Sequence, residues 1–505
     1  MAASQTTRSD RRSVSVSARN MSKELRGFFG RPMTSFYLVI MVTLALVSFG
    51  LVMMASASAV DSIVEYGSPY YLFTRQLVWV GCGLVAMYLA MRVPLSFWRR
   101  ISGPLMILST MMLMLVLIPG IGIEVYGGRR WFDLGPLHLQ PSEVGKVAFL
   151  LWGAHILVSR KKLLNTWSGL LIPLLPGLAI LAGLVVIEPD LGTTLTYLVL
   201  FLALLWGVGA PVRLFVVMGL GVIGAGVIAI LAEPYRLARV TSFLDPWADP
   251  AGAGHQALQG FYALGSGGLT GVGLGNSRTK WGALPNGHSD YIFAIIGEEL
   301  GLIGCATVLL LFAALAYVGL RIAHRATDPF IKLVAAAAVI WQVAQALINI
   351  GYVVGLLPVT GITLPLISSG GTSLIITLFM MGVLAACARH EPAAVTHLKK
   401  KHMRLPAFMR LPVPRSARDS DPFARGGSAR RAPGKGAAKR APTRRPAKRP
   451  ATASRAAARR DAGRAERPAR PRGTGQNSSR TTRNSATRNS ATRNSSRNGR
   501  GRRAG

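Results

Sequence analysis

The sequence predicts an all-α polytopic membrane protein with ten transmembrane helices, one large extracytoplasmic loop and a basic C-terminal tail. Half of the 505 residues are hydrophobic, yet the net charge is +37. These two properties separate along the chain, because residues 389–505 hold 33 Lys and Arg against five acids. We therefore expect a membrane domain at 34–388, between a disordered cytoplasmic N-terminus at 1–33 and a disordered Arg-rich cytoplasmic tail.

Ten apolar runs each approach the ~20 residues that cross ~30 Å of hydrocarbon. They lie at about 34–54, 72–91, 104–120, 142–158, 168–187, 191–208, 212–232, 296–320, 329–352 and 370–388. The loops at 55–71, 188–190 and 353–369 contain no Lys or Arg, whereas the alternate connections contain Arg92, Arg99, Arg100, Arg160, Lys161, Lys162, Arg213, Arg321 and Arg325. This alternation predicts that both termini are cytoplasmic.

Two outer loops depart from this charge rule. They are the loop at 121–141, with Arg129 and Arg130, and the large loop at about 233–290, with Arg236, Arg239, Arg278 and Lys280. An anionic ligand on the outer face would explain these cations, and so would noise in the topology signal. The middle of the large loop, Gly265–Ser277, is Gly-rich and almost uncharged, and the apolar residues before it, from Leu258 to Leu264, predict a short interfacial helix.

Near its end the tail carries a five-residue repeat, TTRNSATRNSATRNS at 481–495, and it is otherwise rich in Arg, Ala, Pro and Gly. Because no aromatic side chains are interleaved for base stacking in its Arg-rich part, 424–505, we expect no nucleic-acid binding. We expect the positive charge of the tail to attract anionic lipids of the inner leaflet or an acidic partner instead. The three cysteines lie in apolar runs and indicate neither a disulfide framework nor a metal cluster.

The stretch GGRRWFDLGPLHLQPSEVGK combines a cationic segment with a predicted helix start. Pro141 is suited to the first position of a helix, so Glu143 falls in the first turn, where the helix dipole favours an anion. Glu143 and Lys146 are three apart and can pair on one helix face. A lysine near the outer interface requires a carboxylate or an anionic ligand. Upstream stand two guanidiniums and a ring that is also typical of an interfacial anchor: Arg129, Arg130 and Trp131.

Two further stretches interrupt the spans. IEPDLGTT, Ile187–Thr194, predicts a tight outer turn whose Glu188 and Asp190 are either solvated or line an extracytoplasmic cavity. The Gly- and Pro-interrupted stretch Asn349–Ile375 requires burial in protein or a wet cavity. Its Ser368 and Ser369 offer hydroxyls and N–H groups to an anion, and helix capping accounts for them equally well.

The stretch LPNGHSDYIFAIIGEEL, Leu284–Leu300, joins the large loop to an apolar helix and carries three carboxylates. Ionisable groups at the mouth of a membrane helix are costly, so they mark a functional site by default. A helix that begins near Asp290 would place Glu298 about 80° from it, facing the same cavity, and Glu299 opposite. We expect Asp290 to be the catalytic residue. His288, two residues before Asp290, is a candidate substrate contact. It belongs to no cluster of His, Cys and acidic residues with metal-ligand spacing, so we do not expect it to bind a metal.

Together these stretches resemble the SEDS family of bacterial membrane proteins (shape, elongation, division and sporulation). The resemblance covers nearly all of 34–388 and is carried by RRWFDLGPLHLQPSEVGK, EPDLGTT, GLGNS, LPNGHSDYIFAIIGEELG and GLLPVTGITLPLISSGGTS. IIGEELG, Ile295–Gly301, and the basic tail are most like the FtsW cell-division branch of actinobacteria, with the RodA branch as the close alternative. One departure is Asn286, where the common pattern has a carboxylate.

The resemblance implies a glycosyltransferase that polymerises lipid II into glycan strands on the outer face of the cytoplasmic membrane, at the division septum. Asp290, Lys146, Arg130 and Trp131 match the family's functional positions. Lipid II carries a sugar α-linked to a diphosphate and the glycan is β-linked, so the reaction inverts C1. Asp290 would be the general base, and Lys146 with an arginine would stabilise the leaving diphosphate.

The resemblance also implies partners and leaves rivals. A class B penicillin-binding protein transpeptidase is the expected partner, and the tail is a candidate contact for other divisome proteins. A divalent cation, Mg²⁺ or Mn²⁺, could share the electrostatic task, although no site for it can be read from the sequence. A lipid II flippase would use the same cationic residues, and a non-catalytic divisome scaffold would act through the tail.

Overall fold

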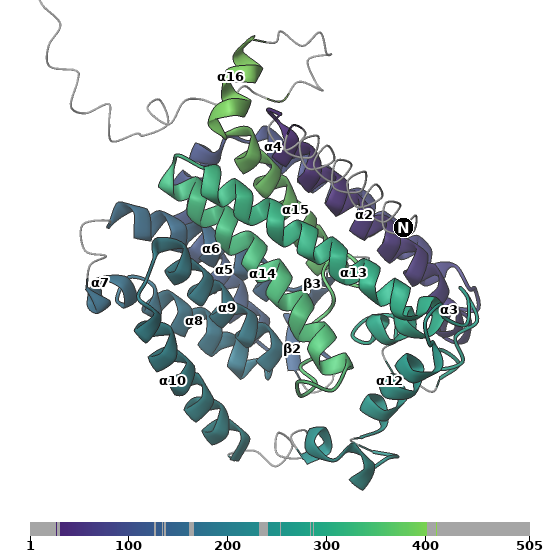
Figure 1. Ribbon diagram of the computed structural model, residues 1–505. Helices are drawn as coiled ribbons and strands as arrows, with labels where there is room; N and C mark the ends of the chain where they lie inside the picture. Colours follow the sequence, from purple (N-terminus) through teal and green to yellow (C-terminus); the bar gives the residue numbers. More distant parts are fainter. Residues whose placement is uncertain are drawn as a thin grey trace, which may run out of the picture. The chain divides into compact units, whose positions relative to one another are not determined.

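The computed structural model describes residue 27, residues 31–400 with gaps at 126–127, 134, 136–137, 161–165, 232–240, 253, 283 and 286, and residue 411. The predicted disordered N-terminus and tail therefore fall almost wholly outside the described residues, as do Arg236, Arg239 and Asn286. Within the described residues the chain is mostly helical (Figure 1), which confirms the predicted helical membrane fold.

All ten predicted apolar runs fall on helices. These helices are α2 (Thr34–Ala57), α4 (Tyr71–Arg92), α5 (Leu95–Val116), α6 (Pro141–Ser159), α7 (Trp167–Leu171) followed by α8 (Leu175–Ile187), α9 (Leu191–Val208), α10 (Val212–Leu231), α13 (Ile292–Arg325), α14 (Pro329–Val353) and α15 (Gly371–Arg389). In the described part of the chain, seven helices are long and apolar enough to cross a membrane: α2, α4, α5, α9, α13, α14 and α15. The number of ten spans and the cytoplasmic position of both termini stay predictions.

Short elements connect the long helices. They are α3 (Ala59–Tyr66), β1 (Gly122–Val125), β2 (Gly128–Asp133), β3 (His138–Leu139), the 3-10 helix η2 (Pro246–Ala248), α12 (His255–Ser266) and α16 (Pro392–Lys400). The helix α12 confirms the short helix predicted around Leu258. In Figure 1, α3 and α12 lie at the end of the helices away from α16.

The three strands form an antiparallel sheet in the order β1-β2-β3, which the sequence did not predict. Glu124 of β1 lies opposite Arg129 of β2 in the register. The sheet was missed because its strands have only four, six and two residues, too short for a clear period-two pattern. Its consequence for function is that Arg129, Arg130 and Trp131 lie on a strand instead of a free loop.

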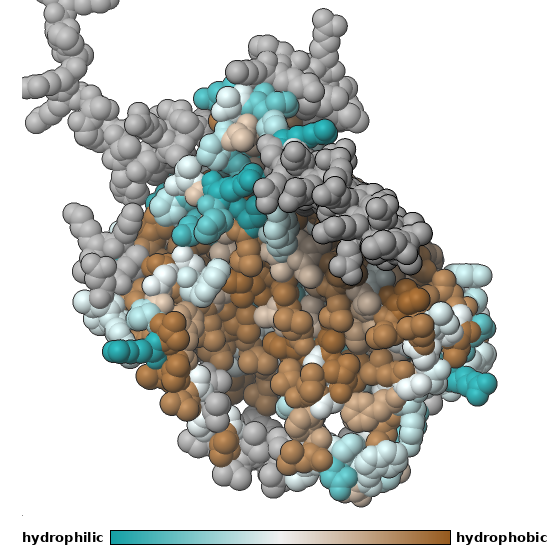
Figure 2. Space-filling model, viewed as in Figure 1, coloured by the Kyte–Doolittle hydropathy of each residue, from teal (hydrophilic) through white to brown (hydrophobic). Residues whose placement is uncertain are grey.

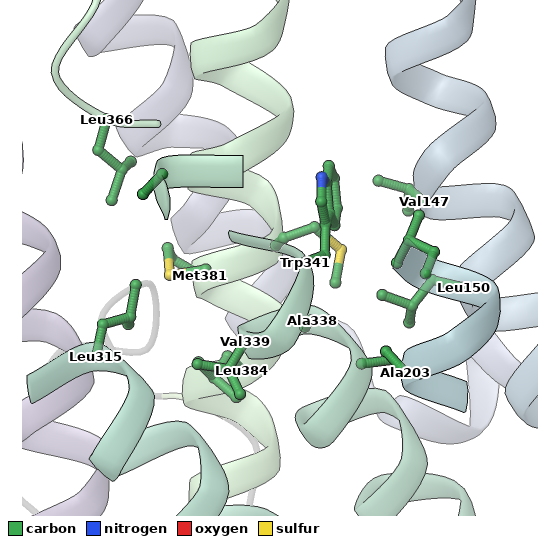
Figure 3. Close-up of a cluster of buried hydrophobic side chains, with 14 of the residues drawn as sticks. Val147, Leu150, Ala203, Leu315, Ala338, Val339, Trp341, Leu366, Met381 and Leu384 are labelled. Carbon is green, nitrogen blue, oxygen red and sulfur yellow. The ribbon is translucent and has the colours of Figure 1, made fainter. Parts of the chain in front are cut away.

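The interior of the membrane domain is built around α14 and α15, the most buried of the spanning helices. Helix α15 packs on α4, α2 and α6, and α14 packs on α13 and α9. Figure 3 shows where they meet: Trp341 of α14 points toward Val147 and Leu150 of α6, while Met381 and Leu384 of α15 lie on its other side. On the face that Figure 2 shows, the surface of the helices is broadly apolar, as contact with lipid requires.

Helix α13 is broken at Gly301, whose φ of 62° and ψ of −158° are not helical. The Gly-rich loop fills the break. Amides of 272–273 donate to the carbonyls of 298–299 at 2.9 and 3.0 Å, and amides of 302–303 donate to the carbonyls of 268–269 at 3.0 and 3.2 Å. These bonds replace the helical ones lost at the break, and they tie the large loop to the start of α13.

Candidate active site

The turn that carries Asp290 is held by α14 and by the loop before α15. The carbonyl of Asp290 accepts hydrogen bonds from Asn349 Nδ2 and from the Tyr352 hydroxyl, each at 2.9 Å. Asn349 Nδ2 also donates to the carbonyl of Ile362 at 2.8 Å, and the single proton of the Tyr352 hydroxyl is shared between the Asp290 carbonyl and that of Ile362, 2.7 Å away, which joins the two segments. A Cβ added at Gly361 would lie 3.8 Å from Asp290 Oδ2. The Asp290 side chain therefore lies against glycine backbone, with its main chain fixed from α14.

His288, two residues earlier, is held in two ways. Its carbonyl accepts from the amide of Ser369 at 3.1 Å. Its ring Nδ1 lies 2.8 Å from Asp61 Oδ2 of α3, and the two side chains are 24% and 35% exposed. The contact joins residues 227 positions apart in sequence. The structure therefore brings Asp61, which the sequence did not single out, into the candidate site.

Lys146 pairs with Glu143, as the spacing allowed. Lys146 Nζ donates to Glu143 Oε1 at 2.7 Å, and both side chains are buried. Nζ also lies 5.1 Å from the ring centroid of Trp341, a cation–π contact. Glu143 Oε2 has no hydrogen-bond partner among the described residues. Pro141 stands at the first position of α6 and Glu143 in its first turn, as predicted. Of the two kinds of partner expected for Lys146, a carboxylate or an anionic ligand, the structure shows a carboxylate, that of Glu143.

The two arginines of β2 have different contacts. Arg129 Nη2 lies 3.0 Å from Glu124 Oε2, and this pair is largely exposed. Arg130 Nε and Nη2 donate to the carbonyls of Glu188 and Pro189, each at 2.8 Å. Arg130 therefore fastens the sheet to the turn between α8 and α9. A guanidinium has five N–H donors, so three remain for an anion. Trp131 is half-buried on the same strand.

The turn between α8 and α9 contains two acids with opposite surroundings. Asp190 caps α9, accepting from the Thr193 amide at 2.9 Å and from the Thr193 hydroxyl at 2.7 Å. Glu188 is fully buried, and neither of its carboxylate oxygens has a hydrogen-bond partner among the described residues. Burial, with the nearby charge of Asp190, raises the pKa of Glu188 to about 8, although Arg130 opposes the shift. At neutral pH Glu188 is therefore mostly uncharged.

The loop before α15 contacts both sides of the candidate site. The Ser368 hydroxyl accepts from the amide of Leu364 at 2.8 Å and so closes a turn, while the N-cap of α15 is Gly370, which has no capping side chain. Leu366 in this loop is a buried non-glycine residue with a φ of 66°, a costly conformation that clusters at functional sites. The Thr372 hydroxyl donates to the carbonyl of His138 in β3 at 2.6 Å.

Glu298 and Glu299 are occupied by the end of the Gly-rich loop. Glu298 accepts from the Ser277 hydroxyl at 2.6 Å and from the amide of residue 278 at 2.8 Å, and also from the Thr279 hydroxyl. Glu299 Oε1 accepts from the Ser56 hydroxyl at 2.6 Å and from Lys280 Nζ at 3.3 Å. Both glutamates are buried. These contacts give each glutamate a role in fixing the large loop.

The described contacts join the predicted site residues in separate groups: Arg130 with the turn of Glu188, Lys146 with Glu143, and His288 with Ser369. Arg130 contacts the Glu188 turn, and a Cβ at Gly192 would lie 2.5 Å from the carbonyl of Thr360, next to the glycine that abuts Asp290. Arg129 contacts Glu124, and Glu298 contacts residues 277–279, outside these groups. Asp61, Asn349 and Tyr352 were missed. Asp61 is one of two acids, with Glu65, in the stretch after the first predicted span, and no pattern in the sequence distinguishes it.

No three His, Cys, Asp or Glu side chains within the described ranges are arranged to hold a metal ion. The divalent cation considered from the sequence stays a prediction. The helical membrane domain defines an integral membrane protein. Comparison with known proteins shows the family to which it belongs.

Residues 36–393 match the model of the FtsW, RodA and SpoVE family, described as "Cell cycle protein". The chain is 45% identical over 388 residues to the probable peptidoglycan glycosyltransferase FtsW of Mycobacterium tuberculosis, covering 77% of this chain and 74% of that protein. It is 41% identical over 355 residues to stage V sporulation protein E of Bacillus subtilis, covering 70% and 97%. The chain belongs to the FtsW, RodA and SpoVE family, which is the predicted SEDS family.

Among solved structures, the fold is similar to a chain of the structure described as "Structural coordination of polymerization and crosslinking by a peptidoglycan synthase complex". The TM-score is 0.60 at 29% identity, and the match covers 70% of this chain and 97% of that chain. The predicted resemblance is therefore confirmed both in sequence and in fold.

Proposed function

We propose that this protein polymerises lipid II into glycan strands on the outer face of the cytoplasmic membrane, with Asp290 as the general base. The predicted class, a peptidoglycan glycosyltransferase of cell division, is confirmed by the names of its relatives. The observation that supports the assignment of Asp290 is the clamp on its turn: Asn349 and Tyr352 both donate to its carbonyl. A base must be held within reach of the proton it removes, and this clamp fixes its main chain.

The reaction would proceed by attack of a sugar hydroxyl on C1 of the lipid-linked sugar. Asp290 would take the proton of that hydroxyl as the new C1–O bond forms, and the bond from C1 to the diphosphate oxygen would break with inversion. The diphosphate leaves with the electron pair of that bond. Its developing negative charge needs cations on the protein.

Arg130 is the best placed of the predicted cations for the diphosphate. Lys146 and Arg129 each lie beside a carboxylate, Glu143 and Glu124, which offsets much of their charge. Arg130 instead contacts two carbonyls, and the acid beside it, Glu188, is mostly neutral at pH 7. Arg130 thus keeps its net positive charge. Lys146 would contribute its remaining N–H donors, and Trp131 would contact the substrate or the lipid interface.

The other predicted contacts follow from their positions. We assign the backbone of Ser369 and the hydroxyl of Ser368 to support of the catalytic turn, since Ser369 donates to the carbonyl of His288. Asp190 holds the start of α9, and its neighbour Glu188 shapes the charge around Arg130. For Glu298 the contacts favour a structural role over substrate binding.

We assign a class B penicillin-binding protein as the partner that cross-links the new strands, at the division septum. The support is the described coordination of polymerization and crosslinking in the similar solved complex. The Arg-rich tail is proposed to contact anionic lipids or acidic divisome proteins, by its charge alone.

The test is the purified full chain in detergent or nanodiscs, incubated with lipid II alone and with its transpeptidase partner. Glycan strands are separated on a gel and quantified. We expect polymer from the wild-type chain and about 10²–10⁴-fold less from Asp290→Ala, the range for loss of a general base. Correct folding of the variant is checked by its melting temperature and by capture of the partner.

A transport assay in the same preparation separates the rival functions. A flippase needs no base, so it should move lipid II across vesicle membranes equally well after Asp290→Asn. If the wild-type chain transports lipid II but makes no glycan polymer, the protein is a flippase and the proposal is wrong. If it captures the transpeptidase partner but shows neither transport nor polymerisation, it is a scaffold.

A further inference from the structure

We infer that Asp61 is a positioning residue for the polymerisation reaction: through the ring of His288, it fixes the turn that carries Asp290. The inference rests on the proposed function and adds a residue from the first extracytoplasmic connection to the site. Asp61 stands in α3, directly after the first long helix, and Oδ2 lies 2.8 Å from His288 Nδ1. That distance is a hydrogen bond between a carboxylate and an imidazole.

The Asp61–His288 contact selects one arrangement of the ring. A carboxylate accepts and does not donate, so Nδ1 must carry a proton. Only Nε2 is then left to contact substrate, and it makes no hydrogen bond within the described part of the chain. A second group that fixes the tautomer and direction of a functional histidine is a common arrangement in active sites.

The helix that carries Asp61, α3, is itself held in place by hydrogen bonds. The Ser62 hydroxyl donates to the carbonyl of Ser68 at 2.5 Å and accepts from the amide of Leu72 at 3.2 Å, which ties α3 to the start of α4. Five residues before Asp61, the Ser56 hydroxyl donates to Glu299 at 2.6 Å. The end of α2 and the start of α3 therefore contact the large loop on both sides of the catalytic turn, at Glu299 and at His288.

A purely structural explanation of the pair is weaker. Both side chains are partly exposed, and an exposed ion pair contributes little to stability. The His288 main chain is already held, because its carbonyl accepts from the amide of Ser369. What the Asp61 contact adds is control of the ring, two residues from Asp290. Placement of groups next to a reacting centre affects rate far more than it affects folding.

The test compares Asp61→Ala and Asp61→Asn with the wild-type full chain, using initial rates of glycan synthesis over a range of lipid II concentrations. We expect Asp61→Ala to lower kcat about tenfold to a hundredfold with little change in KM. Asp61→Asn should fall between, because its side-chain oxygen still accepts from Nδ1 while its charge is lost. The matched control is Glu65→Gln, an exposed acid of the same helix, with wild-type rates expected.

A double-mutant cycle with His288→Ala makes the mechanism specific. If Asp61 acts through the ring, then Asp61→Ala should cost nothing further once His288 is alanine. Equal losses in both backgrounds would overturn the inference, as would a wild-type kcat in Asp61→Ala or an effect confined to KM. Melting temperatures of all variants separate misfolding from misplacement. An inert wild-type chain, or an Asp290→Ala variant as active as wild type, would instead overturn the proposed function.

Discussion

Two buried glutamates of the membrane domain, Glu298 and Glu188, differ in the hydrogen-bond donors that surround their carboxyl groups. Glu298 accepts two hydroxyl hydrogen bonds and one amide hydrogen bond from residues 277–279. Glu188 is just as buried, yet neither of its carboxylate oxygens has a partner among the described residues. A buried carboxylate with donors stabilises the fold, whereas one without donors keeps its proton.

The difference separates structure from electrostatics within the site. The Glu298 contacts fasten the large loop to α13, so that the chain enters the turn of Asp290 from a fixed point. Glu188 affects the electrostatics of the site because it is mostly neutral. A neutral Glu188 does not offset the positive charge of the neighbouring Arg130, which stays available to an anion. Substitution at the two positions should therefore act on different measurements.

Glu298→Ala should have the largest effect on stability. It removes three hydrogen bonds to the carboxyl group and leaves one amide and two hydroxyls without that acceptor. Each such loss costs roughly 1–3 kcal/mol, so the three together should lower the unfolding free energy by about 3–9 kcal/mol. Equilibrium unfolding in mixed micelles measures the change. Glu65→Ala is the control and should stay within about 0.5 kcal/mol of wild type. A Glu298→Ala variant as stable as wild type would remove the structural role.

Gly301→Ala should destabilise the same junction by a smaller amount, about 2–4 kcal/mol. Its φ is +62°, and an added Cβ would lie 2.4 Å from the amide nitrogen of Gly271. Gly81→Ala in α4 is the matched control, because nothing lies within 4 Å of its added Cβ and the residue is helical. The control should be neutral or up to about 1 kcal/mol more stable. Equal effects in the two variants would show that the break in α13 is not tightly packed.

Local spacing predicted the parts of the site that are close in sequence. The three-residue spacing of Glu143 and Lys146 predicted their pairing, and Pro141 predicted the start of α6. The structure confirms both. The same kind of argument was less successful for Glu298. An angle of 80° from Asp290 assumes a continuous helix from 290, but α13 begins at Ile292, so residues 290 and 298 do not share a helical frame.

Contacts between distant segments could not be predicted in this way. Asp61 and His288 are 227 residues apart, and the Asn349 clamp reaches Asp290 across 59 residues. The sequence around each of these side chains is fully explained by a membrane helix or by the end of one, so it gives no sign of a further role. Only packing of α3 and α14 against the catalytic turn gives them a role, and packing of distant helices leaves no periodic signal in one sequence.

Glu188→Gln should have a smaller and pH-dependent effect, which sharpens the contrast with Glu298. The pKa of Glu188 is about 8 in the folded protein against an ordinary 4.5, so the folded state binds more protons between these values. Stability of the wild-type chain must therefore fall as pH rises through that window. Glutamine cannot ionise, so the variant should lose less stability, by about 1–2 kcal/mol between about pH 6 and 7.5.

Melting temperatures of both proteins across that range test the sign of the Glu188 effect. Activity gives a second measurement: above about pH 8 the ionised Glu188 places a negative charge beside Arg130, which should weaken stabilisation of the leaving diphosphate. The alkaline fall in the rate of glycan synthesis should then be shallower in Glu188→Gln than in wild type. Parallel melting and rate profiles in the two proteins would show that Glu188 is already ionised at neutral pH, and that Arg130 is neutralised like Lys146.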